Sequence, residues 1–450
     1  MTRTPIIIPT ILLLVIFNQP ILRSQTTSSQ DETANLITAA RAFIDLLVKK
    51  DFAAAVTTFD DTMKTAMPEA KMQETWNTVL AQVGGFKQAG KARTEKRGGY
   101  TIIIVTSEFE NAKLDIKVVF DQAKRIAGLF FAPATNVDYA PPAYAKPDSF
   151  REKELTIGAS EWALPATLTT PIGPGPFPVV ILVHGSGPND RDETVGANKP
   201  FRDLAWGLAS KGVAVLRYEK RTKQHAGKLA SMRGFTVKDE VLDDALAAVA
   251  LLRKTDGIDP KRIFVLGHSL GGMLIPRIGQ LDPNIAGLIV LAGATRPLED
   301  VIPAQLTYIF SLDGSISPEE QKQIDEAKQQ AAQVKALKPE DANSTAYFFG
   351  GPASYWLNLR GYDPPETAKA LKQPLLILQG ERDYQVTMDD FKRWTTSLAT
   401  KSNVTLKSYP SLNHLFISGT GQSTPSEYEQ PGHVDERVVD DIATWIKQSH

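Results

Sequence analysis

The sequence predicts an α/β protein whose main part is a mostly parallel, doubly wound sheet carrying a helical cap insertion, preceded by a small α+β domain. After residue 150, short apolar runs alternate with amphipathic helical patterns. Before residue 133, two helical patterns precede three strand-like runs. A chain of 450 residues is about three times the usual domain length, so two or three domains are expected.

The composition excludes several classes of function. The chain has 50 Lys and Arg against 51 Asp and Glu, a net charge of −1, so it lacks the basic field that nucleic-acid binding needs. It contains no cysteine, which excludes disulfides, thiolate metal ligands and a cysteine nucleophile. At 42% hydrophobic and 22% charged residues, the chain is predicted to be globular.

Residues 1–24 have the pattern of a secretory signal peptide. Arg3 precedes an apolar run over Ile6–Phe17, and a polar stretch follows from Ser24. The run is too short for a bilayer span, which needs about 20 residues. We therefore expect a periplasmic or secreted protein without stable membrane insertion after signal removal. The alternative is an uncleaved anchor, because Leu22-Arg23-Ser24 is a poor cleavage site.

Residues 31–132 are predicted to form the small α+β domain. Its expected helices and strands are Ala34–Lys50, Pro68–Val83, Tyr100–Phe109, Leu114–Phe120 and Ile126–Phe131. No group of His, Asp or Glu in it indicates chemistry, so homo-oligomer formation, surface binding and a spacer role all stay open. Residues 133–149 contain four prolines and are predicted to be a linker.

Residues 150–450 are predicted to be the catalytic domain. Its expected strands are Val179–His184, Val213–Tyr218, Ile263–His268, Gly287–Ala292, Leu375–Gln379 and Val404–Tyr409, with helices over Phe201–Ser210 and Val237–Lys254. Thr236 and Asp239 nearly form a capping box at the start of the second helix.

A segment over about residues 303–368 is longer than a crossover in such a sheet requires and is predicted to be a cap. Ser317-Pro318-Glu319-Glu320 is a strong helix start. The aromatic residues that follow include Phe348, Tyr355 and Trp356, which we expect to bind the acyl part of a substrate. The alternative is that these aromatics only anchor the insertion to the sheet.

Ser269 is the expected nucleophile. It lies in Gly267-His268-Ser269-Leu270-Gly271, directly after an apolar strand and before a helical pattern. This is the strand, sharp turn and helix of a nucleophile elbow, where flanking glycines relieve steric crowding. The amide of Leu270, at the start of the helix, is expected to face the oxyanion.

A serine nucleophile needs a base, and the base needs a carboxylate to orient it. On such a sheet the order along the chain is serine, acid, histidine, each after a strand. Asp383 follows the strand ending at Gln379, and His414 follows the strand ending at Tyr409. Glu381 and His433 are the alternatives for acid and base.

The loop His184-Gly185-Ser186-Gly187 follows the first buried strand and is expected to supply the second oxyanion donor. The Ser186 amide is the first choice, with Gly185 and Gly187 as alternatives. Asp190 and Asp192 could be read as metal ligands, but Arg191 between them favours salt bridges. No metal and no cofactor are expected.

Taken together, these motifs resemble the α/β-hydrolase superfamily, and within it secreted bacterial carboxylesterases. The resemblance covers residues 154–447, including His184 to Asp192 and Gly380-Glu381-Arg382-Asp383. It implies a triad of Ser269, Asp383 and His414 and activity on short acyl esters. Residues 33–132 resemble a domain of unknown function, similar to nuclear-transport-factor-type folds, that often precedes such esterases.

We therefore expect a serine carboxylesterase that acts on a small-molecule ester through an acyl-enzyme intermediate. A serine peptidase or an acyl thioesterase on the same fold is the enzymatic alternative, and a catalytically silent binding protein is the other. Serine at position 269 excludes the dehalogenase and epoxide-hydrolase chemistry that uses aspartate there.

Overall fold

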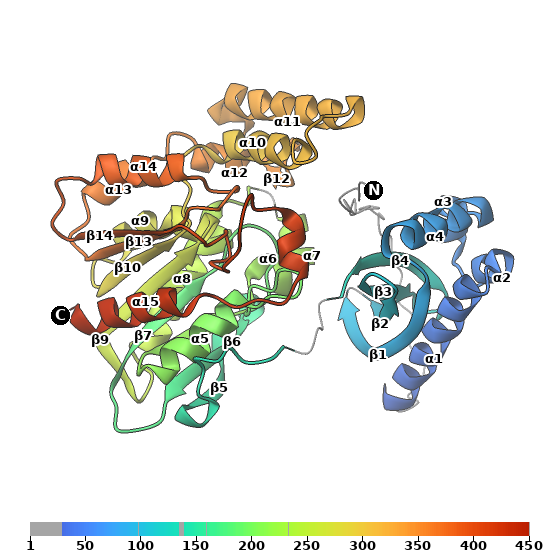
Figure 1. The fold of residues 1–450 in the computed structure, drawn as a ribbon, viewed down its shortest axis with the longest axis horizontal. Coiled ribbons are helices and arrows are strands. Elements are labelled where there is room, and N and C mark those ends of the chain that lie inside the picture. Colours follow the sequence, from blue (N-terminus) through green and yellow to red (C-terminus); the bar gives the residue numbers. More distant parts are fainter. Residues whose placement is uncertain (1–28, 98, 135–138, 159, 233, 450) are drawn as a thin grey trace. The chain divides into compact units, whose positions relative to one another are not determined.

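The computed structural model describes residues 29–97, 99–134, 139–158, 160–232 and 234–449. The chain divides into two compact units, with the boundary between Asp138 and Tyr139 (Figure 1). The expected signal peptide lies outside the described residues. Among the helices of the described part, none is long and apolar enough to cross a membrane.

The first unit packs helices on a four-stranded antiparallel sheet in the order β1-β2-β3-β4. Its elements are α1 (Ser29–Val48), α2 (Phe52–Thr57), α3 (Asp61–Ala66), α4 (Glu69–Val83), β1 (Phe86–Arg97), β2 (Tyr100–Phe109), β3 (Lys113–Phe120) and β4 (Ile126–Pro133). Phe43, Phe59 and Trp76 are buried in its core. The predicted helices and meander are confirmed, whereas β1 was not predicted because charged and polar residues dominate its sequence.

The second unit is built on an eight-stranded sheet in the order β14-β13-β10-β9-β7-β8-β6-β5. Its strands are β5 (Phe150–Ile157), β6 (Leu164–Pro171), β7 (Phe177–Val183), β8 (Ala214–Tyr218), β9 (Ile258–His268), β10 (Gly287–Leu291), β13 (Leu375–Gly380) and β14 (Val404–Tyr409). The strands from β14 to β8 are parallel, and β6 and β5 are added antiparallel at one edge. The predicted mostly parallel sheet is confirmed, with two additional strands.

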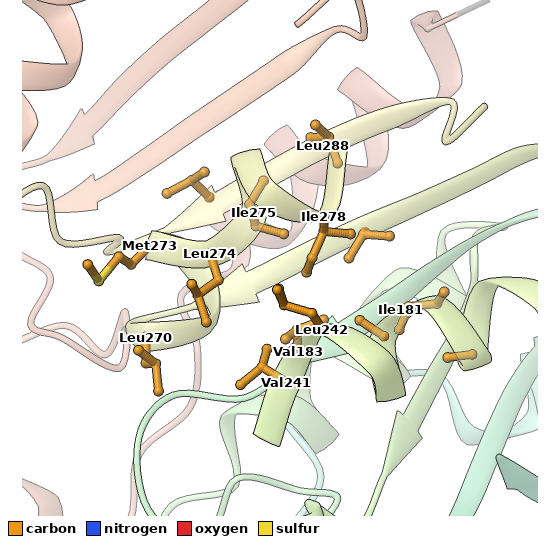
Figure 2. Packing of buried hydrophobic residues seen from close by; sticks show 14 of the residues in the cluster. Ile181, Val183, Val241, Leu242, Leu270, Met273, Leu274, Ile275, Ile278 and Leu288 are labelled. Atoms are coloured by element: carbon orange, nitrogen blue, oxygen red, sulfur yellow. The ribbon is translucent and has the colours of Figure 1, made fainter. Parts of the chain in front are cut away.

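Both faces of this sheet are covered. Along β7, Ile181 and Val183 belong to one core cluster, while Val180 and Leu182 belong to the other. On the first face lie α8 (Asp243–Leu252) and α9 (Leu270–Leu281), and Figure 2 shows Leu274, Ile275 and Ile278 of α9 packed there. On the second face lie α5 (Pro200–Ser210) and α15 (Glu436–Gln448). The alternation of side chains along the strands thus produces the doubly wound arrangement.

The expected helix over Val237–Lys254 is irregular at its start. It opens with a π-helical turn over Lys238–Leu242, and α8 continues from Asp243 to Leu252. The Asp239 carboxylate accepts hydrogen bonds from the Thr236 amide (2.9 Å) and hydroxyl (2.8 Å). Asp239 therefore fixes the start of the helix, as the sequence suggested.

The predicted cap insertion lies between β10 and β13. It contains α10 (Leu298–Phe310), α11 (Pro318–Ala336), the two-residue strands β11 (Tyr347–Phe348) and β12 (Gly351–Pro352), α12 (Ala353–Leu359) and α13 (Pro364–Lys369) (Figure 1). The capping box at the start of α11 is present, with the Ser317 amide bound to Glu320 Oε2 at 2.8 Å and the Glu320 amide to Ser317 Oγ at 3.2 Å.

Residues 139–149 of the stretch expected as a linker belong to the second unit and pack against it. The Tyr144 hydroxyl donates to the Val434 carbonyl at 2.7 Å, and the Tyr139 hydroxyl donates to Asp203 Oδ1 at 2.5 Å. Proline-rich sequence thus includes residues that pack on the sheet domain.

Candidate active site

Ser269 occupies the turn between β9 and α9 in a strained backbone conformation, with φ 55° and ψ −116°. The glycines on either side permit this turn. A Cβ on Gly267 would lie 2.3 Å from the Gly271 carbonyl oxygen, and one on Gly271 would lie 2.4 Å from the Val183 carbonyl oxygen. Only residues without a side chain fit these two positions. The G-x-S-x-G spacing is therefore dictated by backbone packing around the serine.

The amide of Leu270 opens α9, and the first amides of a helix have no partner within it. The positive end of the helix dipole lies at the same place. A negative charge that develops beside Ser269 would therefore be stabilised by α9.

Asp383 and His414 meet in the structure. Both are buried, and Asp383 Oδ2 lies 2.6 Å from His414 Nδ1. The other carboxylate oxygen accepts the amides of Gln385 (2.8 Å) and Val386 (3.0 Å), which fix the carboxylate in place. With Nδ1 donating to Asp383, the Nε2 lone pair of His414 is the acceptor of the ring.

The loop that carries His414 lies close to the serine turn. His268, which precedes Ser269, has its Nε2 2.9 Å from the His414 carbonyl oxygen, and the two rings are 4.6 Å apart between centroids. Gly380 permits this approach on the side of β13, because a Cβ there would lie 2.5 Å from the Leu412 carbonyl oxygen. The structure thus brings the segments of Ser269, Asp383 and His414 together at the carboxyl ends of the parallel strands.

The two alternatives for acid and base have partners elsewhere. Glu381 Oε1 accepts the Ser408 hydroxyl at 2.7 Å. His433 Nδ1 lies 3.0 Å from Asp203 Oδ1 on α5. Asp383 is therefore paired with His414 and not with His433.

The loop after β7 faces the serine. A Cβ on Gly185 would lie 3.0 Å from the Cβ of Ser269. The Gly185 amide donates to Glu193 Oε1 at 2.6 Å, which removes it from the candidate oxyanion donors. Ser186 and Gly187 remain, and the Ser186 side chain is exposed.

The carboxylates of the same loop are engaged within the protein. Asp190 accepts the amide (2.9 Å) and hydroxyl (2.8 Å) of Thr194, and Asp192 pairs with Arg217 and, at 2.6 Å, with Arg202. Arg191 pairs with Glu154 at 2.7 Å and with Glu219 at 2.9 Å. No group of three or more metal-ligating side chains occurs among the described residues. The expected salt bridges of Arg191 are present.

The sequence did not reveal two buried charged residues, Glu193 and Lys220, that bind the backbone of Gly185. Glu193 Oε2 lies 3.0 Å from His268 Nδ1, and Lys220 Nζ donates to the Gly185 carbonyl at 2.6 Å. Burial is the largest single influence, and alone it would raise the pKa of Glu193 and lower that of His268. The attraction between the two groups, together with the hydrogen bonds to the Gly185 amide and the His414 carbonyl, outweighs it, so the pKa of Glu193 is lowered and that of His268 is raised. Both shifts favour the ionised pair. In the sequence, Glu193 looks like another charged residue of a solvated loop, and nothing there indicates that it is buried.

The cap aromatics lie against the sheet domain. Trp356 is 3% exposed, its indole nitrogen donates to the Phe348 carbonyl at 2.9 Å, and Phe349 packs edge-on against it at 5.5 Å. Tyr355 stacks on Phe235 at 5.9 Å. Tyr355 and Trp356 both belong to the core cluster of α8 and α9, and Phe348 packs against that cluster. These are the contacts that the anchoring alternative predicts.

Comparisons with known proteins identify related families. The family model described as serine aminopeptidase, S33 matches residues 176–421, and a family described as a protein of unknown function (DUF3887) matches residues 40–129. The chain is 40% identical over 404 residues to esterase EstD of Thermotoga maritima, covering 90% of this chain and 93% of the relative.

More distant similarities were also found. The chain is 25% identical over 275 residues to a monoacylglycerol lipase of Mycolicibacterium smegmatis, covering 60% of this chain and 88% of the relative. The solved structure of Est1E from Butyrivibrio proteoclasticus has 18% identity and a TM-score of 0.41, and the match covers 66% of this chain and 96% of that one.

Proposed function

The chain belongs to the α/β-hydrolase family that includes esterase EstD and is a serine carboxylesterase, and from that premise we propose that Ser269, His414 and Asp383 are its catalytic triad. The observation that carries the assignment is the buried 2.6 Å contact between Asp383 and His414, next to a serine in a strained strand-to-helix turn. A catalytically silent binding protein would have no use for this arrangement.

The reaction follows from the roles of these groups. Ser269 Oγ attacks the ester carbonyl carbon while His414 Nε2 takes its proton, and Asp383 stabilises the imidazolium. The tetrahedral oxyanion is held by the amides of Leu270 and Ser186. Its collapse expels the alcohol, which takes the proton from His414, and leaves an acyl-serine. Water, deprotonated by His414, then attacks the acyl group and releases the carboxylic acid and free Ser269.

We propose short acyl esters as the substrate class, as the resemblance implies. The serine aminopeptidase description of the matched family makes an amide substrate the second candidate. Initial rates on acyl esters of increasing length, on an aminoacyl amide and on an acyl thioester separate these classes. Faster turnover of the amide than of every ester would refute the esterase proposal.

The triad is tested by following acylation directly. Mass spectrometry after mixing with a slowly deacylating ester should show a covalent adduct on the peptide that contains Ser269 and none in Ser269→Ala. An adduct on another residue would refute the assignment of the nucleophile.

A further inference from the structure

Both backbone polar groups of Gly185 are held by buried charged side chains. The amide donates to Glu193 Oε1 at 2.6 Å, and the carbonyl oxygen accepts from Lys220 Nζ at 2.6 Å. Glu193 is 3% and Lys220 2% exposed. Taking a lysine ammonium and a carboxylate out of water is unfavourable unless partners compensate for the lost hydration. Two such groups on one glycine therefore indicate that the fold fixes the orientation of the peptide units on both sides of Gly185.

Lys220 is itself fixed by neighbouring groups. Its ammonium lies 2.6 Å from Glu240 Oε1, and burial together with this nearby carboxylate raises the pKa of the Tyr355 hydroxyl on α12. The backbone amide of Lys220 donates to the Asn189 carbonyl at 3.1 Å. The ammonium thus has a fixed position relative to the Gly185 carbonyl.

The planarity of the peptide unit carries this position to Ser186. The Gly185 carbonyl and the Ser186 amide belong to the same unit, and in a trans peptide the C=O and N–H bonds point in opposite directions. An ammonium that fixes the oxygen on one side therefore fixes the direction of the N–H on the other. A cation on the carbonyl also polarises the unit, which makes the Ser186 amide a stronger hydrogen-bond donor.

We propose that Lys220 is a positioning residue of the oxyanion hole: it orients and polarises the peptide unit whose Ser186 amide binds the oxyanion formed at Ser269. Glu193 holds the preceding peptide unit and, through His268, the loop of His414. This inference rests on the proposed triad and on Ser186 as a donor. The alternative is an ion pair of Lys220 and Glu240 that stabilises the fold without affecting the reaction.

The main test compares wild type with Lys220→Met and with the double variant Lys220→Met/Glu240→Gln, in which no carboxylate is left unpaired. Loss of a complete oxyanion donor costs about 10²- to 10³-fold in kcat, so a misdirected donor should cost about 10- to 100-fold. KM should stay within about twofold, because the donor acts on the transition state. A trifluoromethyl ketone, which forms a tetrahedral oxyanion with the serine, should lose affinity by the same factor as kcat/KM.

Asp203→Asn is the matched control. Asp203 is also a buried carboxylate that accepts a backbone amide, that of Val434 at 2.9 Å, and faces a histidine, His433. It has no contact with the Gly185 loop among the described hydrogen bonds and ion pairs. Its loss should lower the melting temperature while kcat per active site and inhibitor affinity stay at wild-type values.

The proposal is overturned if the double variant folds and keeps wild-type kcat and ketone affinity, or if its kcat falls while ketone affinity does not. If the double variant does not fold, Asn189→Ala decides by the same criteria, because Asn189 Nδ2 donates to the same Gly185 carbonyl at 3.2 Å from a half-buried position. Its effect should be smaller and of the same kind. Failure of the triad itself is recognised separately, by ester turnover and ketone adduct formation in Ser269→Ala.

Discussion

Replacing Trp356 by alanine distinguishes an anchoring role of the cap aromatics from a role in substrate binding. The indole is 3% exposed and lies 5.7 Å from the Tyr355 ring between centroids. Truncation of a buried tryptophan costs about 3 to 5 kcal/mol. At about 2 to 4 °C per kcal/mol for a large domain, the melting temperature should fall by about 6 to 20 °C.

The assay combines calorimetric melting with initial rates on esters of increasing acyl length. Trp356→Ala should have a lower melting temperature and keep the wild-type order of preference among acyl chains. Trp356→Phe should recover most of the lost stability. Tyr347→Ala, on the β11–β12 hairpin that precedes α12, is the control, because Tyr347 is 54% exposed and its truncation should leave the melting temperature unchanged. An unchanged melting temperature with an altered acyl preference in Trp356→Ala would refute the anchoring interpretation and establish an acyl pocket.

Further predictions concern the reaction and its supporting groups. Ser269→Ala and His414→Ala should each lower kcat by about 10⁴- to 10⁶-fold, and the double variant should be little worse, because triad members act as a unit; additive losses would contradict this. Asp383→Asn should lower kcat by about 10⁴-fold at unchanged melting temperature, since it removes the acceptor that sets the His414 tautomer. Activity should be insensitive to EDTA, and a loss that zinc or magnesium restores would overturn the metal-free mechanism. The lowered pKa of Glu193 contributes stability that is complete above its unfolded pKa of about 4.3 and is lost as the pH falls through its folded pKa. The raised pKa of His268 contributes stability that is complete below its unfolded pKa of about 6.5 and is lost as the pH rises through its folded pKa. The unfolding free energy of wild type minus that of Glu193→Gln should therefore be largest between about pH 4.3 and 6.5, and a difference that does not vary with pH would refute an ionised pair.

Most strands of the large sheet that could be predicted from the sequence are buried on both faces, and the exception is the edge strand β14. Runs such as Val179–Val183 and Ile263–Leu266 are continuously apolar because helices cover both sides of the parallel sheet. The edge strand β5 has a mostly exposed, charged sequence and could not be recognised in this way. The local apolar pattern thus predicts the parallel strands of this sheet, including β14 at one edge, and misses the antiparallel strands β6 and β5 at the other.

The meeting of the segments that carry Ser269, Asp383 and His414 could also be predicted, because the topology of a parallel sheet brings the carboxyl ends of successive strands together. Ser269, Asp383 and His414 each follow a strand that the sequence reveals. The roles of the cap aromatics could not be predicted, since an aromatic side chain has the same sequence signal whether it binds a ligand or fills a core. For Trp356 the difference lies in a hydrogen bond to Phe348 and in its packing on the sheet domain.

The charged loop after β7 shows why supporting groups escape sequence reasoning. A loop with alternating Asp, Arg, Asp and Glu is normally solvated, and burial of one of its carboxylates is unfavourable in isolation. Glu193 is buried because two partners face it: the Gly185 amide of the same loop, and His268, which only the fold brings to this loop. A buried charge therefore depends on contacts that are distant in sequence. The same dependence makes Glu193 and Lys220 sensitive probes of the active-site backbone. Removal of Glu193 leaves the Gly185 amide without its acceptor, and removal of Lys220 leaves the Gly185 carbonyl with only the Asn189 side chain as donor.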